Sequence, residues 1–344
     1  MFIIIFSLLL TFILSNNFIN ILTFKNFDNY ILKNKLTDNN TFINNNIKYY
    51  NFINVAYAFD NIYYYITHVS MKSLMVNQNK NTFIIFHIFV SKDIYNEQKP
   101  VIEKICLEHT NCKINFYQIG DEFNEFSPVG KIITRTRGIF YRLIIQNFLK
   151  KEKKTFYFDC DTIINKDLTE MYNYNINDRY YIGELEGPPI RKYGSNLKNF
   201  INSGVILINL DKLRKDHIYD KMVKFLRKYN NQLYFLDQDV INVVCNKKND
   251  FFPSNYISSG ICDVGSMRNI NLQKNEGKLY LEPFIFHFKG YNDKPWTGIV
   301  NMNNIVCFDP ITRFYEYAKK SSYYYEILDK YQINIKNCFK QNLY

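Results

Sequence analysis

The chain is poor in the residues that interrupt or loosen regular structure. It has 12 glycines and 8 prolines among 344 residues, and alanine is also rare, with only three positions. No repeat with a period of roughly 20 to 50 residues is visible, so collagen-like, low-complexity and repeat architectures are excluded. With 47% hydrophobic and 22% charged residues, the composition also lies far from that of disordered proteins. The length predicts one large or two moderate globular domains.

Cysteine motifs for metal cages and redox sites are also missing. The seven cysteines contain no CxxC pair, which argues against a zinc ribbon and a thioredoxin-like site. In an oxidising compartment Cys106 could pair with Cys112 and Cys245 with Cys262, and the odd number leaves at least one thiol free.

The positive net charge does not by itself predict a nucleic-acid partner. The 43 basic and 32 acidic residues give +11, but the abundance of Asn, Ile, Lys, Tyr and Phe beside so few alanines is typical of an AT-rich genome. No run of Lys or Arg is interleaved with aromatic side chains, and residues 150–154 form a short charged turn before an apolar strand. We therefore expect no nucleic-acid partner.

A single long apolar run stands at the N-terminus. Residues 2–14 are almost unbroken apolar, a length that fits a signal-peptide core and falls short of the roughly 20 residues that span a bilayer. We interpret residues 1–24 as a signal peptide or membrane anchor, and the Asn-rich residues 25–50 as a stem. This predicts a membrane-associated or secretory-pathway protein. If residues 1–24 are instead a buried or mis-started N-terminus, the protein acts at the cytoplasmic face.

Beyond residue 50, short apolar runs alternate with longer amphipathic stretches. Such alternation predicts an α/β fold with a mostly parallel central sheet flanked by helices. The catalytic domain is expected to cover residues 51–300, followed by a C-terminal helical extension at 301–344. We expect strands at 54–59, 82–90, 113–117 and 154–158, and helices at 61–76, 94–108 and 137–149.

An acidic pair follows the strand at 154–158. Asp159 and Asp161 flank Cys160 directly after that apolar segment. Ligands of open α/β sheets collect at the carboxyl ends of strands, so both carboxylates are placed where chemistry is usual. Oxygen ligands at this spacing favour Mg²⁺ or Mn²⁺, usually shared with a phosphate. Taken alone, the triplet also fits a solvated turn.

Three further stretches favour the functional interpretation. Residues 201–210 read as a small-residue turn that enters a buried strand, and residues 236–242 place polar side chains at the front of a helix. Residues 285–296 end a strand with His287 and then carry a Gly-x-x-x-Lys segment just before the only Trp.

In order and spacing, the acidic pair and these stretches resemble the family 8 retaining glycosyltransferases, from about Asn54 to Trp296. The resemblance implies a GT-A type nucleotide-diphospho-sugar transferase fold that binds a UDP-sugar and Mn²⁺, with Mg²⁺ as the other candidate. Phe59 departs from the family pattern, because an acidic residue is frequent there. The positions that match the family are the metal ligands Asp159, Asp161 and His287; the diphosphate contacts Gly290 and Lys294; the donor-sugar residues Arg142, Asn202, Asp237 and Gln238; and the first-strand nucleotide contacts Ala58, Asp60 and Asn61.

The resemblance predicts a metal-dependent hexosyltransferase that moves glucose or galactose from a UDP-sugar to a glycan, lipid-linked or protein acceptor. A bound cation and Lys294 would offset the charge of the leaving diphosphate. Because Gln is a poor nucleophile, we expect the acceptor to attack the anomeric carbon on the face from which the leaving group departs. Gln238 would stabilise positive charge at the anomeric centre, and Asp237 would form hydrogen bonds with sugar hydroxyls. Asp237 also fits a plain helix N-cap.

Two other functions remain open from the sequence. The chain could be a catalytically silent glycan-binding protein that keeps the fold, or a nucleotidyltransferase, although no Gly-rich basic loop follows the first strand. Acceptor contacts are expected from residues 187–199. The aromatic and basic segment 314–331 fits either an interfacial membrane helix or an ordinary helix packed on the catalytic domain.

Overall fold

The computed structural model describes residues 42–44, 47–59, 63–92, 95–126, 137–187, 190–193, 195–197, 200–259, 282–289, 294–296 and 305–330. The chain divides into two compact units, residues 1–51 and 52–344. In the first unit, β1 (Phe42–Asn44) and β2 (Ile47–Tyr49) form an antiparallel hairpin. The expected signal or anchor at residues 1–24 lies outside the described residues. Among the described helices, none combines the length and apolar character needed to cross a membrane.

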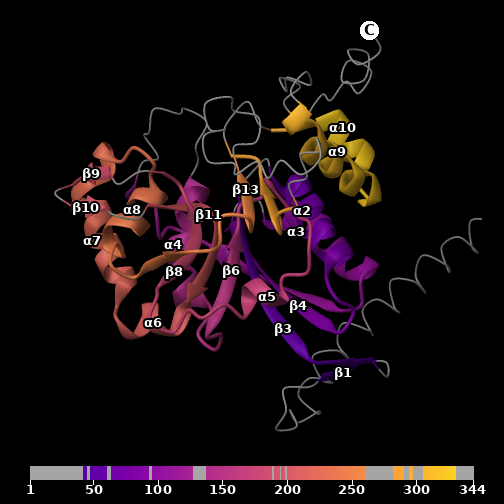
Figure 1. Cartoon of the computed structure of the whole chain (residues 1–344), viewed down its shortest axis with the longest axis horizontal. Coiled ribbons are helices and arrows are strands. Elements are labelled where there is room, and N and C mark those ends of the chain that lie inside the picture. Colours follow the sequence, from indigo (N-terminus) through magenta and orange to yellow (C-terminus); the bar gives the residue numbers. More distant parts are fainter. Residues whose placement is uncertain are drawn as a thin grey trace, which may run out of the picture. The chain divides into compact units, whose positions relative to one another are not determined.

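The second unit is built on a seven-stranded sheet in the order β12-β8-β11-β6-β3-β4-β5 (Figure 1). The pairs β3–β6, β4–β5 and β12–β8 are parallel, whereas β11 runs antiparallel to both of its neighbours. The expected mostly parallel α/β sheet is confirmed. The strands are β3 (Asn51–Phe59), β4 (Thr82–Ser91), β5 (Cys112–Ile119), β6 (Lys154–Phe158), β8 (Tyr181–Leu185), β11 (Ile201–Asn209) and β12 (Asn249–Phe251).

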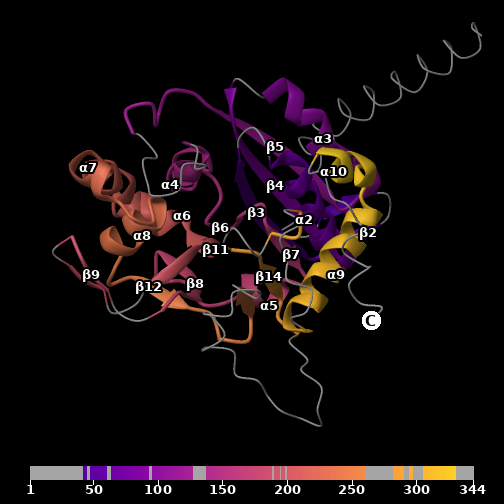
Figure 2. The same ribbon diagram turned by 90° about the horizontal axis from the view of Figure 1, so that it is seen from above.

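Helices cover both faces of this sheet, as the view from above shows (Figure 2). Successive strand residues point to opposite faces. Phe156 therefore belongs to the core cluster that includes Met71 of one helical layer, and Tyr157 belongs to the cluster that includes Leu143 of the other. The first layer holds α2 (Tyr64–Asn77) and α3 (Tyr95–Glu108); the second holds η2 (Arg137–Phe140), α4 (Tyr141–Phe148), α6 (Leu210–Lys215), α7 (Ile218–Tyr229), η3 (Asn230–Gln232) and α8 (Asp237–Val244).

A small second sheet lies at the carboxyl end of β6 and carries part of the site. It has the order β13-β14-β7, with β14 antiparallel to β7. Its strands are β7 (Thr162–Ile164), β13 (Ile257–Ser259) and β14 (Ile285–His287), and the remaining elements are α5 (Thr169–Tyr172) and the hairpin of β9 (Ile190–Lys192) and β10 (Ser195–Leu197).

The segment expected to be a turn at the start of residues 201–210 is part of β11 itself. Its pairing with β8 shifts register between Ile201 and Ile206, so residues 202–205 bulge out of the regular ladder. The expectation of a turn was wrong, because a bulge serves the same purpose: it frees the backbone amides of Ser203 and Gly204 from the β8 ladder to bond to side-chain oxygens without ending the strand.

The C-terminal helices α9 (Ile305–Lys320) and α10 (Tyr324–Lys330) pack on the second unit. Phe314 and Ile327 are buried in a cluster with Phe288 and Trp296, and Tyr325 is the member of the aromatic segment that stands out, 79% exposed. The structure therefore favours the packed helix over the interfacial one for this segment.

The expected cysteine pairs are only partly described. Cys106 and Cys112 are free thiols whose sulfur atoms lie 2.6 Å apart, between the end of α3 and the start of β5. Cys245 is a free, buried thiol, and Cys262 lies outside the described residues.

Candidate functional site

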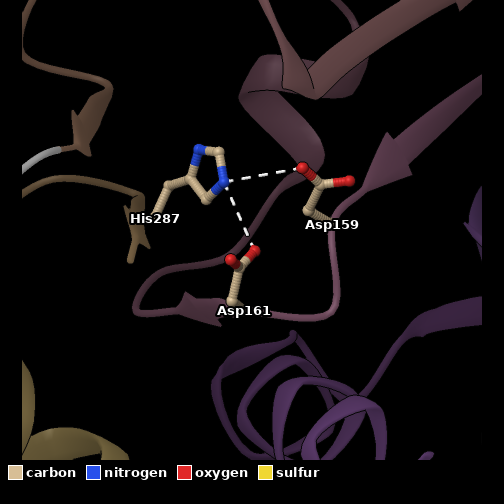
Figure 3. Close-up of side chains that lie close together, drawn as sticks. All are labelled: Asp159, Asp161 and His287. Atoms are coloured by element: carbon tan, nitrogen blue, oxygen red, sulfur yellow. Dashed lines mark ion pairs between the residues drawn. The ribbon is translucent and has the colours of Figure 1, made fainter. Parts of the chain in front are cut away.

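Two carboxylates and an imidazole converge where the two sheets meet (Figure 3). Asp159 follows β6, Asp161 precedes β7, and His287 ends β14. His287 Nε2 lies 3.3 Å from Asp161 Oδ1 and 3.7 Å from Asp159 Oδ2, and one donor atom from each residue fits within a 4.8 Å group. The three residues that the sequence pattern selected as metal ligands are thus brought together.

The surroundings of these donors fit a divalent cation. Asp161 Oδ1 is buried and receives no hydrogen bond from the described part of the chain. Burial lowers the pKa of His287, which keeps its imidazole neutral and able to ligate. Burial also opposes the charge of Asp159, but the Arg142 guanidinium and the hydrogen bond from Tyr157 outweigh it and hold the Asp159 pKa below its ordinary value. Two carboxylates and one imidazole form a donor set that suits Mn²⁺.

Gly204 of β11 lines the same point. A Cβ atom at this position would lie 2.4 Å from His287 Cε1 and 2.5 Å from Asp159 Oδ2. The Gly204 carbonyl oxygen also accepts a hydrogen bond from the Asp159 amide at 2.7 Å. The bulged strand therefore approaches His287 and Asp159 as closely as it does because residue 204 has no side chain.

Arg142 of α4 joins the acidic pair to the front of α8. Its Nη2 lies 2.9 Å from Asp159 Oδ1, and its Nε lies 3.1 Å from Asp237 Oδ2. The guanidinium also packs 4.5 Å from the centre of the Tyr157 ring. Burial opposes the positive charge, but Asp159 and Asp237 raise the pKa of Arg142 above its ordinary value. Arg142 therefore stays charged and fixes both carboxylates.

Hydrogen bonds of side-chain amides connect the bulge of β11 to the start of α8. Gln238 Oε1 accepts from the Ser203 amide at 3.1 Å, and Asn202 Oδ1 accepts from the Gly204 amide at 2.8 Å. The Asn202 amide nitrogen donates to Glu186 Oε2 at 2.8 Å. Hydrogen bonds to the bulge of β11 therefore fix the side chains of Asn202 and Gln238. The sequence pattern predicted a turn at this place.

Backbone strain precedes the predicted catalytic pair on α8. Leu236 is buried with φ 53° and ψ −116°, a conformation that non-glycine residues rarely adopt. Asp239 stabilises this turn, because its Oδ2 accepts from the amides of Tyr234 and Phe235 at 2.8 and 2.9 Å. The strained turn directs Asp237 toward Arg142. Leu236 itself is the N-cap and makes no side-chain cap bond, so Asp237 is not the plain N-cap that the sequence also allowed.

Lys294 reaches the acidic pair from the last predicted stretch. Its ammonium pairs with Asp161 Oδ2 and donates to the Phe288 carbonyl oxygen at 2.7 Å. Ala58 lies beside the turn that carries Asp159 and Asp161, since its carbonyl oxygen is 3.8 Å from the Cys160 sulfur. The other predicted nucleotide and diphosphate contacts, Asp60, Asn61 and Gly290, lie outside the described residues.

Several polar residues of the site were not predicted from the sequence. Glu184 lies on β8, and Glu186 directly follows that strand. Lys289 donates to Glu186 Oε2 at 2.9 Å. Burial raises the pKa of Glu184, whose Oε1 accepts from the Ser259 hydroxyl at 2.5 Å. Lys289 was the one that the sequence could have indicated, because it stands only two residues after His287 in the stretch 285–296.

Comparison with known proteins agrees with this geometry. The family model described as glycosyl transferase family 8 matches residues 54–299. A Haemophilus influenzae protein named as a glycosyltransferase is 27% identical over 212 residues, covering 59% of this chain and 62% of that protein. The chain thus spans less than two thirds of that relative. The lipopolysaccharide 1,2-glucosyltransferase of Escherichia coli is 25% identical over 255 residues, covering 71% of this chain and 72% of that one.

Among solved structures, the galactosyltransferase LgtC in complex with donor and acceptor sugar analogues superposes with a TM-score of 0.61 at 18% identity, covering 78% of this chain and 96% of that one. The glycosyltransferase GlyE of Streptococcus pneumoniae gives a TM-score of 0.56 at 18% identity, covering 81% of this chain and 63% of that one. At these identities the likeness supports the GT-A type fold.

Proposed function

We propose that this chain, which belongs to glycosyl transferase family 8, transfers a hexose with retention from a UDP-sugar to an acceptor in a metal-dependent reaction. The observation that carries the proposal is the convergence of Asp159, Asp161 and His287 beside two cationic side chains, Arg142 and Lys294. The hexose is glucose or galactose, and the acceptor is a glycan, a lipid-linked molecule or a protein.

Asp159, Asp161 and His287 would hold Mn²⁺, or Mg²⁺ in its place. When bound, the cation supplies Lewis-acid stabilisation of the leaving diphosphate. Different side chains orient the proposed ligands and offset the charge of the leaving group. Asp159 Oδ1 accepts from Tyr157 and pairs with Arg142, which leaves Oδ2 facing His287. Lys294 adds a second positive charge next to Asp161, at the place where negative charge develops on the leaving group.

The donor sugar would lie beside the contact that Arg142 makes with the start of α8. Asp237 is fixed by Arg142, so its carboxylate is oriented to accept from sugar hydroxyls. Gln238 and Asn202 are fixed by the β11 bulge, and the Gln238 carbonyl oxygen can stabilise positive charge at the anomeric carbon. An amide side chain is a poor nucleophile, so the acceptor hydroxyl attacks on the face from which UDP departs.

Purified full-length protein incubated with a panel of UDP-sugars and Mn²⁺ tests the proposal through the UDP released. We expect turnover with UDP-glucose or UDP-galactose that stops with EDTA. Asp161→Ala should lower turnover by at least about a hundredfold, because the change removes a charged ligand. Asp178→Ala, at an exposed acidic residue after α5, should leave turnover unchanged.

Turnover that persists in EDTA would contradict the metal assignment. Absence of UDP release from any donor, with UDP binding intact, would favour the alternative of a catalytically silent glycan-binding protein.

We further infer that residues 1–24 attach the protein to a membrane, and that this segment acts without an interfacial helix from residues 314–331, since that segment packs on the core. Full-length protein should sediment with membranes, and deletion of residues 1–24 should release most of it. Full-length protein that stays in the supernatant at low salt would overturn this inference.

A further inference from the structure

A row of buried hydroxyl groups leads from the interior to the backbone of Asp159. The Tyr57 hydroxyl lies 2.9 Å from Ser70 Oγ, and Ser70 Oγ lies 2.9 Å from Thr162 Oγ1. The Thr162 hydroxyl donates to the Asp159 carbonyl oxygen at 2.8 Å. The three side chains come from β3, α2 and β7 and are buried. The row therefore connects the large sheet and one helical layer to the turn that carries both predicted carboxylate ligands.

The direction of the hydrogen bonds in this row is determined. A carbonyl oxygen only accepts, so the single proton of the Thr162 hydroxyl is committed to Asp159. Ser70 must then donate to Thr162, and Tyr57 must donate to Ser70. Burial raises the pKa of Tyr57 well above its ordinary value, which keeps the first donor protonated. Every hydroxyl proton is used, so removal of one member leaves the next without its donor.

Helix α2 also takes the place of a neighbouring strand along the outer edge of β7. The Ile164 amide donates to Ser73 Oγ at 2.8 Å, and the Ile164 carbonyl oxygen accepts from Asn77 at 2.9 Å. On the other edge β7 pairs with β14, and Thr162 lies directly opposite His287. Thr162 is thus next to Asp161 in sequence, bonded to the Asp159 carbonyl and paired with His287 across the small sheet.

We propose that Thr162, supported by Ser70 and Tyr57, is a positioning residue of the metal site. The hydroxyl row holds the peptide group that follows Asp159. It thereby sets the distance from Asp159, which follows the large sheet, to Asp161 and His287, which lie at the small sheet. This inference rests on the proposed function, because it assigns a role toward the proposed cation.

Mn²⁺ binding to metal-free full-length protein, measured by calorimetry without any sugar nucleotide, tests the inference. Thr162→Val keeps the shape of the side chain but removes the hydroxyl, and should weaken Mn²⁺ binding about tenfold, the lower end for outer partners of metal ligands. Thr162→Ser keeps the hydroxyl and should restore most of the affinity. Ser70→Ala should weaken binding less than Thr162→Val, since it acts one bond further away.

Ser73→Ala is the matched control. Ser73 lies on the same helix and bonds to β7 but makes no bond to Asp159, so its loss should lower the melting temperature and leave Mn²⁺ affinity unchanged. If Thr162→Val, or Ser70→Ala should the valine variant not fold, binds Mn²⁺ as the wild type does, the positioning role is wrong while the proposed function stands. If the wild type itself binds neither Mn²⁺ nor Mg²⁺, both are wrong.

Discussion

At the scale of single residues, the site depends as much on a missing side chain as on the charged ones. Gly204 lets β11 pass within contact of His287 and Asp159, and its backbone binds the Asp159 amide. The aspartates and the histidine could be predicted from the sequence because they end or follow apolar strands. Gly204 and Ser203 could not be given a role, since a glycine or serine in a strand has no chemical signature until its neighbours in space are known.

Gly204→Ala is therefore expected to abolish Mn²⁺ binding and to lower turnover by at least about a hundredfold, at a stability cost of roughly 1–3 kcal/mol. The added methyl must displace His287 or Asp159. Calorimetric Mn²⁺ titration checks the first effect, and urea unfolding checks the second. Gly120→Ala is the control, because its Cβ would meet only Glu122 Oε2 at 3.6 Å. Wild-type Mn²⁺ affinity in Gly204→Ala would show that the site adapts around the methyl group.

At the scale of elements, the pattern located most strands and helices but not their partners. Residues 154–158 form β6 with the expected ends, whereas β11 runs opposite to β6. Every residue of β11 is buried, and an apolar run buried on both faces carries no mark of strand direction. The aromatic segment at 314–331 is likewise ambiguous alone. Its partners, Phe288 and Trp296, lie in a separate stretch, so the sequence could not decide between core and membrane.

At the scale of the whole molecule, two buried histidines outside the candidate site make the free energy of unfolding depend on pH. Burial lowers the pKa of His68 to about 4 and of His87 to about 3, both below the ordinary 6.5. His87 is held neutral by two bonds, since its Nε2 donates to Asn54 Oδ1 at 3.0 Å and its Nδ1 accepts from Tyr117 at 3.1 Å. Their contribution to stability is complete above pH 6.5 and is lost as the pH falls toward 4, because the unfolded chain then binds more protons.

Each histidine should lower the free energy of unfolding by about 2 kcal/mol between pH 7.5 and 5. Urea unfolding at several pH values across this range measures the slope. His87→Gln should show a shallower slope than the wild type, whatever its stability at pH 7.5. Equal slopes in the two proteins would mean that His87 is protonated in the folded state.

The charges around Arg142 have a consequence for the order in which ligands enter. Asp159, Asp161 and Asp237 carry three negative charges, Arg142 and Lys294 carry two positive ones, and His287 is neutral. Before a cation binds, this group is therefore net negative and repels a diphosphate. A divalent cation reverses the sign. Under the proposed function, we therefore expect the cation and the nucleotide sugar to bind with positive cooperativity, each raising the affinity of the other by the same factor, with the cation entering first or together with the donor.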